Sequence, residues 1–402
     1  MRLTLVSEPR TAVTPASTHL APAVNLTEGV RDPGNYLHEL ECLRGLAILL
    51  VFLFHAWGIS GLQWPTQPTP GLAFIAAGNT GVTLFFVLSG FLLSLPWLRY
   101  WLHPGQRKPS VTQYLKARAM RILPLYYCAL AVTWLATGNT GIVVQAAAFQ
   151  FVGFSAFPYS VVWWTLVTEV QFYLLLPLLM SLWISGRRGR WLCMALLLAW
   201  AWAYLELVLK ASPAVPGSTF FLTKSVFARL PAFMLGVFAA AFYLRASRWE
   251  CVNRQAKVWR YSGLLLTLAS LLLLEHVLNR AATMGDLQAE LEWHLHHSWE
   301  AALWAVMMLC LLLCRLPGAQ LLINPGMAVT GKLSYSLYLI HVPILFYLVY
   351  PLREQIGVDQ LHNSWWLYTI SAAALLLSVL LSWGSYTLIE RPFLRMKRGL
   401  AT

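Results

Sequence analysis

Long apolar runs alternate with short polar loops along most of the chain. The runs lie near residues 43–63, 80–98, 122–138, 141–157, 161–184, 191–209, 226–244, 261–279, 299–316, 330–351 and 366–388. A helix of about 20 apolar residues crosses the roughly 30 Å of hydrocarbon in a bilayer, and these runs approach or exceed that length. The pattern therefore predicts an all-α fold, a polytopic bundle of membrane-spanning helices.

Composition supports a membrane protein and argues against one that binds nucleic acid. Of the 402 residues, 58% are hydrophobic and 11% are charged, which is too apolar for soluble domains. The net charge of +13 would suit a nucleic acid, but the basic residues lie in short loops between apolar runs. This placement is typical of the positive-inside rule. We therefore expect membrane lipids as partners and no nucleic acid.

The basic loop residues also predict the topology. If all eleven runs crossed the membrane, Arg187, Arg188 and Arg190 would face opposite to the basic loop 99–121, against the positive-inside bias. The weakest candidate is 141–157, which is short and bounded by Gly and Pro residues. Treating it as a re-entrant or interfacial segment leaves about ten transmembrane helices, with both termini cytoplasmic.

The domain organisation follows from these assignments. Residues 1–37 are mixed and polar, without the apolar core of a signal peptide, and are expected to form a disordered cytoplasmic tail. Residues 38–395 form the transmembrane domain, and residues 396–402 form a basic C-terminal tail.

The first run carries an arginine and a histidine within apolar surroundings. Arg44 and His55 are eleven positions apart, which is three helical turns plus about 20°, so both lie on one face, roughly 16 Å apart along the axis. Ionisable side chains in a span are costly and indicate function. The alternative is that Arg44 anchors the helix by snorkelling while His55 bonds a neighbouring helix.

A carboxylate is expected at a similar depth in another span. Glu169 lies about eight residues from the outer end of its run, as His55 does in the first. A buried carboxylate at that depth can orient an imidazole or favour its charged form. Alternatively, Glu169 pairs with another cation such as Arg229.

At the predicted cytoplasmic edge, Arg118 and Arg121 share one helical face, with Lys116 nearby. Guanidinium groups presented in this way suit phosphate oxygens. Anionic lipid headgroups would use the same residues, so this alternative stays open.

Seven sequence blocks together resemble the acyltransferase-3 family of integral membrane acyltransferases. The blocks are the pair Arg44 and His55, then 81-GVTLFFVLSGFLLS-94, 118-RAMRILPLYY-127, 164-WTLVTEVQFYLLLPLL-179, 229-RLPAFMLG-236, 331-GKLSYSLYLIHVPI-344 and 385-SYTLIERPFLR-395. They extend from about residue 40 to residue 395, nearly the whole chain. Val170 and Ala232 stand where members often carry acidic residues, which puts a second carboxylate at those positions in doubt.

The resemblance implies a bacterial inner-membrane enzyme of O-acyl transfer. The donor would be cytoplasmic acyl-CoA, usually acetyl-CoA, and the acceptor a hydroxyl of an extracytoplasmic or lipid-linked molecule, often a glycan. The candidate catalytic residues are His55, Arg44 and Glu169; the candidate donor-binding residues are Arg118, Arg121, Arg44 and Lys116; further motif positions are Ser334, Tyr335, His341, Arg229 and Glu390.

For the mechanism we expect His55 to be the general base, because acyl transfer needs a base for the attacking hydroxyl. The chain has no Gly-x-Ser-x-Gly elbow, so a covalent serine mechanism lacks support. Transfer through an acyl-histidine stays open. His341 is a second candidate, and a structural, hydrogen-bonded histidine explains it equally well.

No metal is expected. In the segment 284–300, a helix would place Glu290, His294 and His297 on one face, a geometry that can bind zinc, although a solvated or interfacial helix is the commoner outcome. The competing function for the whole chain is a transporter or flippase of a glycan or small metabolite, with the buried Arg, His and Glu residues as a relay.

Overall fold

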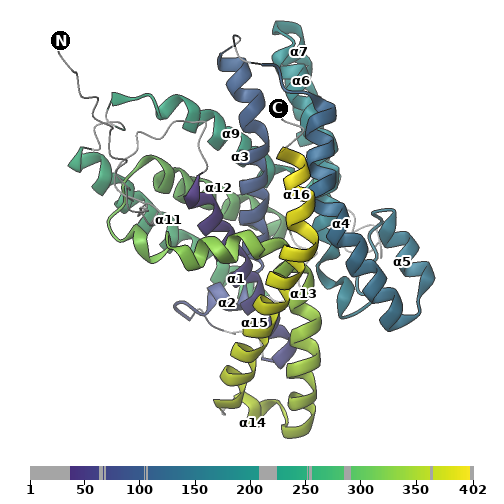
Figure 1. Cartoon of the computed structure of the whole chain (residues 1–402). Coiled ribbons are helices and arrows are strands. Elements are labelled where there is room, and N and C mark those ends of the chain that lie inside the picture. The colour runs from purple at the N-terminus through teal and green to yellow at the C-terminus, as the bar shows by residue number, and fades with distance from the viewer. Residues whose placement is uncertain are drawn as a thin grey trace, which may run out of the picture. The chain divides into compact units, whose positions relative to one another are not determined.

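Every element in the described part of the chain is helical (Figure 1). The computed structural model describes residues 37–62, 67, 69–103, 105, 107–207, 224–250, 252, 256–284, 291–362 and 365–398. The longer helices are α1 (His38–Ser60), α3 (Thr80–Leu102), α4 (Val111–Thr137), α6 (Trp163–Ile184), α7 (Arg187–Leu207), α9 (Val226–Ala246), α11 (Lys257–Met284), α12 (Leu291–Leu313), α13 (Pro325–Ile356) and α15 (Trp365–Ser385). Shorter elements are α2 (Ala73–Ala76), α5 (Thr140–Ala147), α14 (Val358–His362), α16 (Arg391–Arg398), the 3-10 turns Tyr159–Val162 and Ala319–Leu321, and a π-helical turn Tyr386–Glu390.

The polytopic helical bundle predicted from the apolar runs is confirmed. Within the described residues, nine helices are long and apolar enough to cross a membrane. One further expected span, 191–209, is described as far as residue 207. Its described part forms most of α7, which is not among these nine and begins with the arginines Arg187 and Arg188. In the run 141–157, helix α5 has eight residues and so a length of about 12 Å, too short to cross the bilayer.

The predicted tails fall largely outside the described residues. Of the N-terminal tail 1–37, only Leu37 is described, and residues 399–402 at the other end are not described. Residues 396–398, expected to belong to the C-terminal tail, are the last residues of α16. The cytoplasmic location of both termini stays a prediction.

Helices α1 and α13 cross with their backbones in direct contact. An added Cβ at Gly331 would lie 1.8 Å from the carbonyl oxygen of Glu41, and one at Gly45 would lie 2.3 Å from that of Met327. Small residues permit this approach between membrane helices, where packing and not hydrophobic exclusion drives association. The contact aligns the polar face of α1 with one face of α13 along their length.

A stacked aromatic core joins α3, α6 and α9. Phe233 of α9 stacks on Phe172 of α6 with ring centroids 3.9 Å apart and on Phe86 of α3 at 4.6 Å. The close approach of α3 and α9 is again made by a glycine, since a Cβ at Gly90 would lie 2.0 Å from the carbonyl oxygen of Phe233. Aromatic pairs in offset stacks add stability beyond the area they bury.

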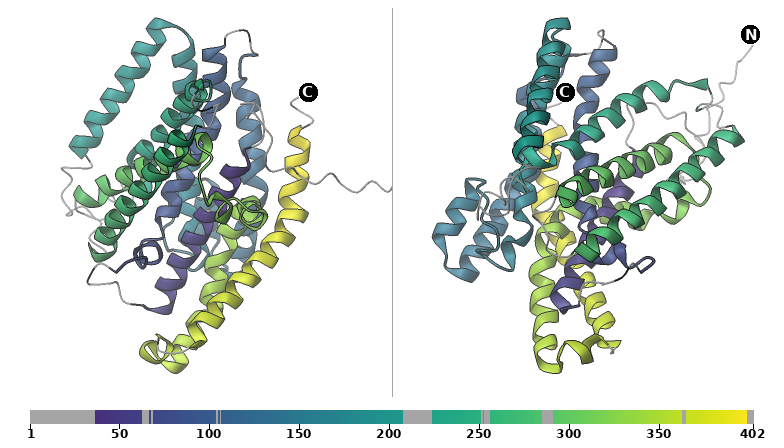
Figure 2. Two further views of the ribbon diagram at one scale, coloured as in Figure 1. Left: turned by 90° about the vertical axis from the view of Figure 1, so that its left-hand side faces the viewer. Right: turned by 180° about the vertical axis from the view of Figure 1, so that it is seen from behind.

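The C-terminal helices return along this bundle. Helices α13 and α15 run side by side in opposite directions, joined through α14 (Figures 1 and 2). Beyond α15 the chain continues through the π-helical turn into α16, and this turn brings Glu390 toward α4 and α13.

We predict that Gly331→Ala destabilises the protein. The added methyl group would overlap the backbone of α1, and overpacking of this kind costs about 1–3 kcal/mol. Thermal unfolding of the purified protein in detergent measures the effect. Gly384→Ala is the matched control, because a Cβ at that helical glycine meets nothing within 4 Å. Equal melting temperatures for the two variants would contradict the close crossing of α1 and α13.

Candidate active site

Two histidines meet where α1 and α13 cross toward the C-terminal end of α1. The Nε2 atom of His341 lies 3.1 Å from Nδ1 of His55, and the two rings are nearly perpendicular, with centroids 5.0 Å apart. His341 is completely buried, whereas His55 is partly exposed. The partner of His55 is thus another imidazole.

Backbone carbonyls assign the protons on this pair. Nδ1 of His341 lies 3.0 Å from the carbonyl oxygens of both Leu337 and Tyr338, so it carries the proton and donates, which leaves Nε2 as an acceptor in the neutral ring. Nδ1 of His55 lies 2.9 Å from the carbonyl oxygen of Val51 and therefore also donates. This N–H is shared between Val51 and His341, and the lone pair of His55 lies on Nε2.

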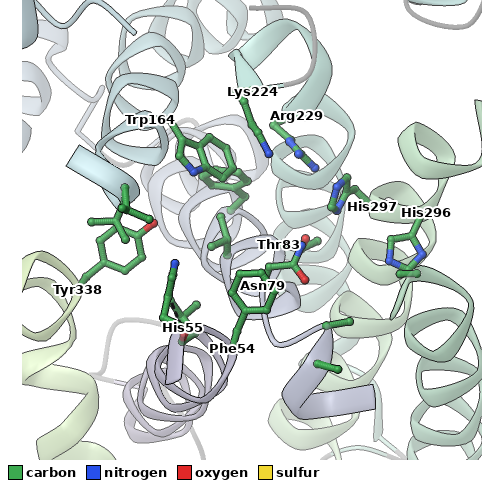
Figure 3. A pocket seen from close by; sticks show the side chains of 18 of the residues that line it. Phe54, His55, Asn79, Thr83, Trp164, Lys224, Arg229, His296, His297 and Tyr338 are labelled. Atoms are coloured by element: carbon green, nitrogen blue, oxygen red, sulfur yellow. Dashed lines mark hydrogen bonds between the residues drawn. The ribbon is translucent and has the colours of Figure 1, made fainter. Parts of the chain in front are cut away.

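His55 lines a cavity in the described part of the chain that is larger than the two cavities described below. This cavity has a volume of about 390 Å³ and includes Trp164 of α6, Tyr338 of α13 and Arg229 of α9 in its walls. Figure 3 shows the His55 ring pointing into it from α1, with Tyr338 on one side. The Tyr338 hydroxyl is held in place by a 2.8 Å hydrogen bond with Thr165.

Three arginines line a second cavity of about 70 Å³, toward the N-terminal end of α1. They are Arg44, Arg118 and Arg121. Nη2 of Arg44 donates to Ser334 Oγ at 3.3 Å. The Nε atoms of Arg44 and Arg118 are buried and have no hydrogen-bond acceptor within the described part of the chain. Buried donors without acceptors are rare, and they favour a site for an anion.

Arg121 is held by the C-terminal segment. It forms an ion pair with Glu390 at 3.5 Å, and Glu390 is only 3% exposed. Ser336 donates to the same carboxylate. The guanidinium also lies 5.9 Å from the centroid of the Tyr335 ring, whose hydroxyl donates to the Ile122 carbonyl at 2.8 Å. Tyr335 of α13 and Glu390 of the π-helical turn, both positions of the family motifs, thus hold Arg121 in this cavity.

A third cavity, of about 60 Å³, adjoins both of the others. It shares Arg44 and Glu169 with the arginine cavity, and Val82, Phe86 and Tyr338 with the histidine cavity. The three cavities therefore follow one another along the face of α1 that carries Arg44 and His55.

The structure places the remaining predicted residues as follows. Glu169 lies in the arginine cavity, where its carboxylate accepts hydrogen bonds from Ser89 at 2.8 Å and Tyr173 at 3.1 Å. Glu169 therefore lies with the arginines of that cavity. The hydrogen-bond contacts described for His55 are instead with Val51 and His341. Lys116 is exposed and lines none of the three cavities.

Several lining residues were not among the sequence candidates. Lys224 and Trp164 line the histidine cavity, as does His296. Lys224 lies two positions before the apolar run 226–244. A lysine at the start of an apolar run is a signal that the residue lies at a membrane boundary. Trp164 lies within a quoted block but carries no charge to single it out.

Only part of the candidate zinc site, Glu290, His294 and His297, lies within the described residues. The side chains of Glu290 and His294 lie outside the described residues. His297 lies near the buried Glu300, 3.6 Å from its Oε1, and His296 contacts the same oxygen at 2.5 Å. Among the described residues, no group of three or more His, Cys, Asp or Glu side chains has a geometry that could hold a metal ion.

Comparison with known proteins gives one family and several relatives. A family model described as an acyltransferase domain matches residues 37–383. The chain is 25% identical over 403 residues to "Nodulation protein 10" of Rhizobium leguminosarum bv. viciae, covering 90% of this chain and 95% of the relative. It is 30% identical over 152 residues to "Putative acetyltransferase ORF330" of Acidianus two-tailed virus, covering 36% and 41%. It is 26% identical over 194 residues to "Putative membrane-bound transacylase BcsY" of Komagataeibacter xylinus, covering 43% and 44%. No solved structure matches.

We predict that Glu390→Gln destabilises the protein by about 1–3 kcal/mol, because it leaves the Arg121 guanidinium without its buried counter-charge. Unfolding of the two single variants and of Arg121→Gln/Glu390→Gln forms a double-mutant cycle. The double variant should cost less than the sum of the singles. Strict additivity would show that the two groups do not interact in the folded protein.

Proposed function

The chain belongs to the acyltransferase-3 family, and we propose that it moves an acyl group, acetyl in particular, from cytoplasmic acyl-CoA to a hydroxyl of an extracytoplasmic or lipid-linked glycan. The names of two relatives, an acetyltransferase and a membrane-bound transacylase, support acyl transfer and an acetyl group. We place the enzyme in the bacterial inner membrane, with α1 beginning on the cytoplasmic side.

One observation carries this proposal: adjoining cavities link an arginine cluster at one end of α1 to a histidine at the other. Acyl-CoA is a long, thin molecule with phosphates at one end and a thioester at the other. Arg44 and His55 are separated by roughly 16 Å along the helix, at about 1.5 Å per residue. The arginines would therefore hold the charged end while the thioester reaches toward the imidazole.

On the donor side, the phosphates and the upper part of the pantetheine arm would lie among Arg44, Arg118 and Arg121. The buried Nε donors of Arg44 and Arg118 support this, since a phosphate would supply the acceptors that they lack within the described part of the chain. Glu169 would serve there as the carboxylate that offsets part of the positive charge when the donor is absent.

On the acceptor side, His55 acts as general base. Its Nε2 lone pair takes the proton of the acceptor hydroxyl as the hydroxyl oxygen attacks the thioester carbonyl carbon. The carbon–sulfur bond then breaks, the new ester is released, and the CoA thiolate receives the proton from His55. His341 is a positioning residue, since it accepts from Nδ1–H of His55 and so keeps the basic nitrogen toward the cavity.

We predict that His55→Ala abolishes transfer, with a fall in turnover of roughly 10²–10⁴-fold, the usual contribution of a general base. The assay follows thiol release from acetyl-CoA in the presence of a crude glycan acceptor. His276→Ala, at an exposed histidine of α11, is the control for loss of an imidazole. If His55→Ala retains wild-type turnover at normal expression, His55 is not the base.

His341 allows a second comparison within the same assay. Glutamine at position 341 can still accept a hydrogen bond from Nδ1–H of His55, whereas leucine cannot. His341→Gln should therefore retain more turnover than His341→Leu, with little change in the KM for acetyl-CoA. Equal losses would mean that His341 does not act through His55.

We predict that replacing Arg118 and Arg121 with Gln weakens binding of CoA in a salt-sensitive manner, because two charge-assisted contacts to phosphate are lost. Isothermal titration with CoA at two ionic strengths measures this. Arg118→Gln alone leaves the Arg121–Glu390 pair intact, and Arg187→Gln, at an exposed arginine of α7, is the charge-matched control. Unchanged CoA affinity would favour lipid headgroups as the ligand of these arginines.

A further inference from the structure

Tyr338 lies where the cavity at His55 meets the cavity that leads to the arginines. Val82, Phe86 and Tyr338 line both of these cavities, and Tyr338 is the one of the three with a hydrogen-bonding side chain. Figure 3 shows its hydroxyl group pointing into the histidine cavity, on the same side as His55. A thioester that extends from the arginines to His55 would therefore pass this hydroxyl group.

Helix α13 sets the position of Tyr338 relative to the two histidines. Tyr338 and His341 are three positions apart, so their side chains lie on one helical face. Their ring centroids are 5.9 Å apart, and the centroid of the His341 ring is 5.0 Å from that of His55. Nδ1 of His341 also donates to the backbone carbonyl oxygen of Tyr338. The residue that positions His55 is thus also a neighbour of Tyr338, which keeps the base and the phenol at a fixed separation.

The side chain of Tyr338 is held on several sides. It is 7% exposed, and the ring of Phe85 meets it edge to face, with centroids 6.3 Å apart and planes at 81°. Thr165, in the first turn of α6, donates to the phenolic oxygen at 2.8 Å. A donor that is already held in place needs no rearrangement when charge develops in a reaction, which makes it effective in catalysis.

The direction of the bond with Thr165 leaves the hydrogen of the phenol for a ligand. The one hydroxyl hydrogen of Thr165 has two acceptors in reach, and Tyr338 at 2.8 Å is closer than the Val162 carbonyl oxygen at 3.0 Å. Tyr338 is the acceptor in this bond, and its own hydrogen has no acceptor among the described residues. A hydroxyl group that accepts one hydrogen bond donates a stronger one, because the two bonds polarise each other. Thr165 thus makes Tyr338 a better donor.

We propose that Tyr338 donates a hydrogen bond to the thioester carbonyl oxygen and stabilises the negative charge that develops there during transfer. This inference rests on the proposed function, in which His55 activates the acceptor hydroxyl. As the acceptor oxygen bonds to the carbonyl carbon, one electron pair of the C=O bond moves onto the carbonyl oxygen. The bond from Tyr338 then strengthens, and its proton stays on the phenol. When the C=O bond re-forms, the carbon–sulfur bond breaks and its electron pair leaves with the sulfur of CoA.

Tyr338→Phe tests the inference, because it removes the hydroxyl group and keeps the ring. Thiol release from acetyl-CoA by the purified full-length protein, with a crude glycan extract as acceptor, gives kcat and KM. We expect kcat to fall by roughly 10²–10³-fold, the usual effect of removing one such donor. The KM for acetyl-CoA should be nearly unchanged, since the hydrogen bond reaches its full strength only in the transition state.

Tyr126→Phe is the matched control for loss of a buried phenolic hydroxyl. The Tyr126 hydroxyl donates to the Ala146 carbonyl oxygen at 2.9 Å, and the residue lines none of the three cavities. This variant should keep the kcat of the wild-type protein. Melting temperatures of both variants show that each is folded when it is assayed.

Thr165 is a positioning residue in this inference, and it provides a second test if Tyr338→Phe does not fold. Thr165→Val keeps the shape of the side chain and removes the bond to Tyr338, so kcat should fall about tenfold, the size of one hydrogen bond. Thr165→Ser restores the hydroxyl group and should retain most of the turnover. Because Thr165 acts through Tyr338, Thr165→Val should cost little more in the Tyr338→Phe background.

Several results overturn the inference. They are a wild-type kcat in folded Tyr338→Phe, a loss that appears only in KM, or an equal fall of kcat in Tyr126→Phe. If Tyr338→Phe does not fold, a wild-type kcat in Thr165→Val overturns it, as do equal losses in Thr165→Val and Thr165→Ser.

These outcomes are distinct from failure of the proposed function. Turnover kept by Tyr338→Phe and lost by His55→Ala removes only the inference. Turnover kept by His55→Ala and lost by Tyr338→Phe removes only the assigned base. A wild-type protein that releases no thiol from acetyl-CoA contradicts the proposed transfer, and the inference with it.

Discussion

The direct contact between α1 and α13 is the constraint on which the site depends. Two glycines, Gly45 and Gly331, allow the backbones to touch, so one face of α13 follows the polar face of α1. Toward the N-terminal end of α1, Ser334 contacts Arg44, and toward its C-terminal end, His341 contacts His55. Any separation of the two helices would remove Ser334 from Arg44 and His341 from His55. The close contact of α1 and α13 thus positions the side chains of the proposed site as well as packing the two helices.

Burying a charged group within a membrane is costly, which explains why the carboxylates near these cavities have polar partners. Glu169 accepts hydrogen bonds from Ser89 and Tyr173, and the Glu390 carboxylate accepts one from Ser336 and forms an ion pair with Arg121. Such networks are required where no water solvates a charge. The buried Nε donors of Arg44 and Arg118 both lie at the arginine cavity, and no acceptor in the described part of the chain satisfies them.

The helices could be predicted from the sequence, and the arrangement around the site only in part. Apolar runs and loop charges predict the bundle and make 141–157 the weakest candidate for a span, because both signals are local. Position along a helix gives depth but not direction, so the similar depth of Glu169 and His55 does not decide which group Glu169 meets; in the structure Glu169 lies among the arginines. The pairing of His55 with His341, 286 positions away, depends on helix crossing and has no local signal.

Charge along the three cavities is distributed in a way that suits transfer across a membrane. Cations lie at both ends, Arg44, Arg118 and Arg121 at one and Lys224 and Arg229 at the other. The cavity between them is lined by apolar and aromatic side chains such as Val82, Phe85 and Phe86, with Arg44 and Glu169 on the side of the arginine cavity. In the proposed reaction, the uncharged pantetheine arm and acyl group extend from the arginines toward His55. The phosphates of the donor stay with the arginines, so no charge of the donor has to move toward the centre of the membrane.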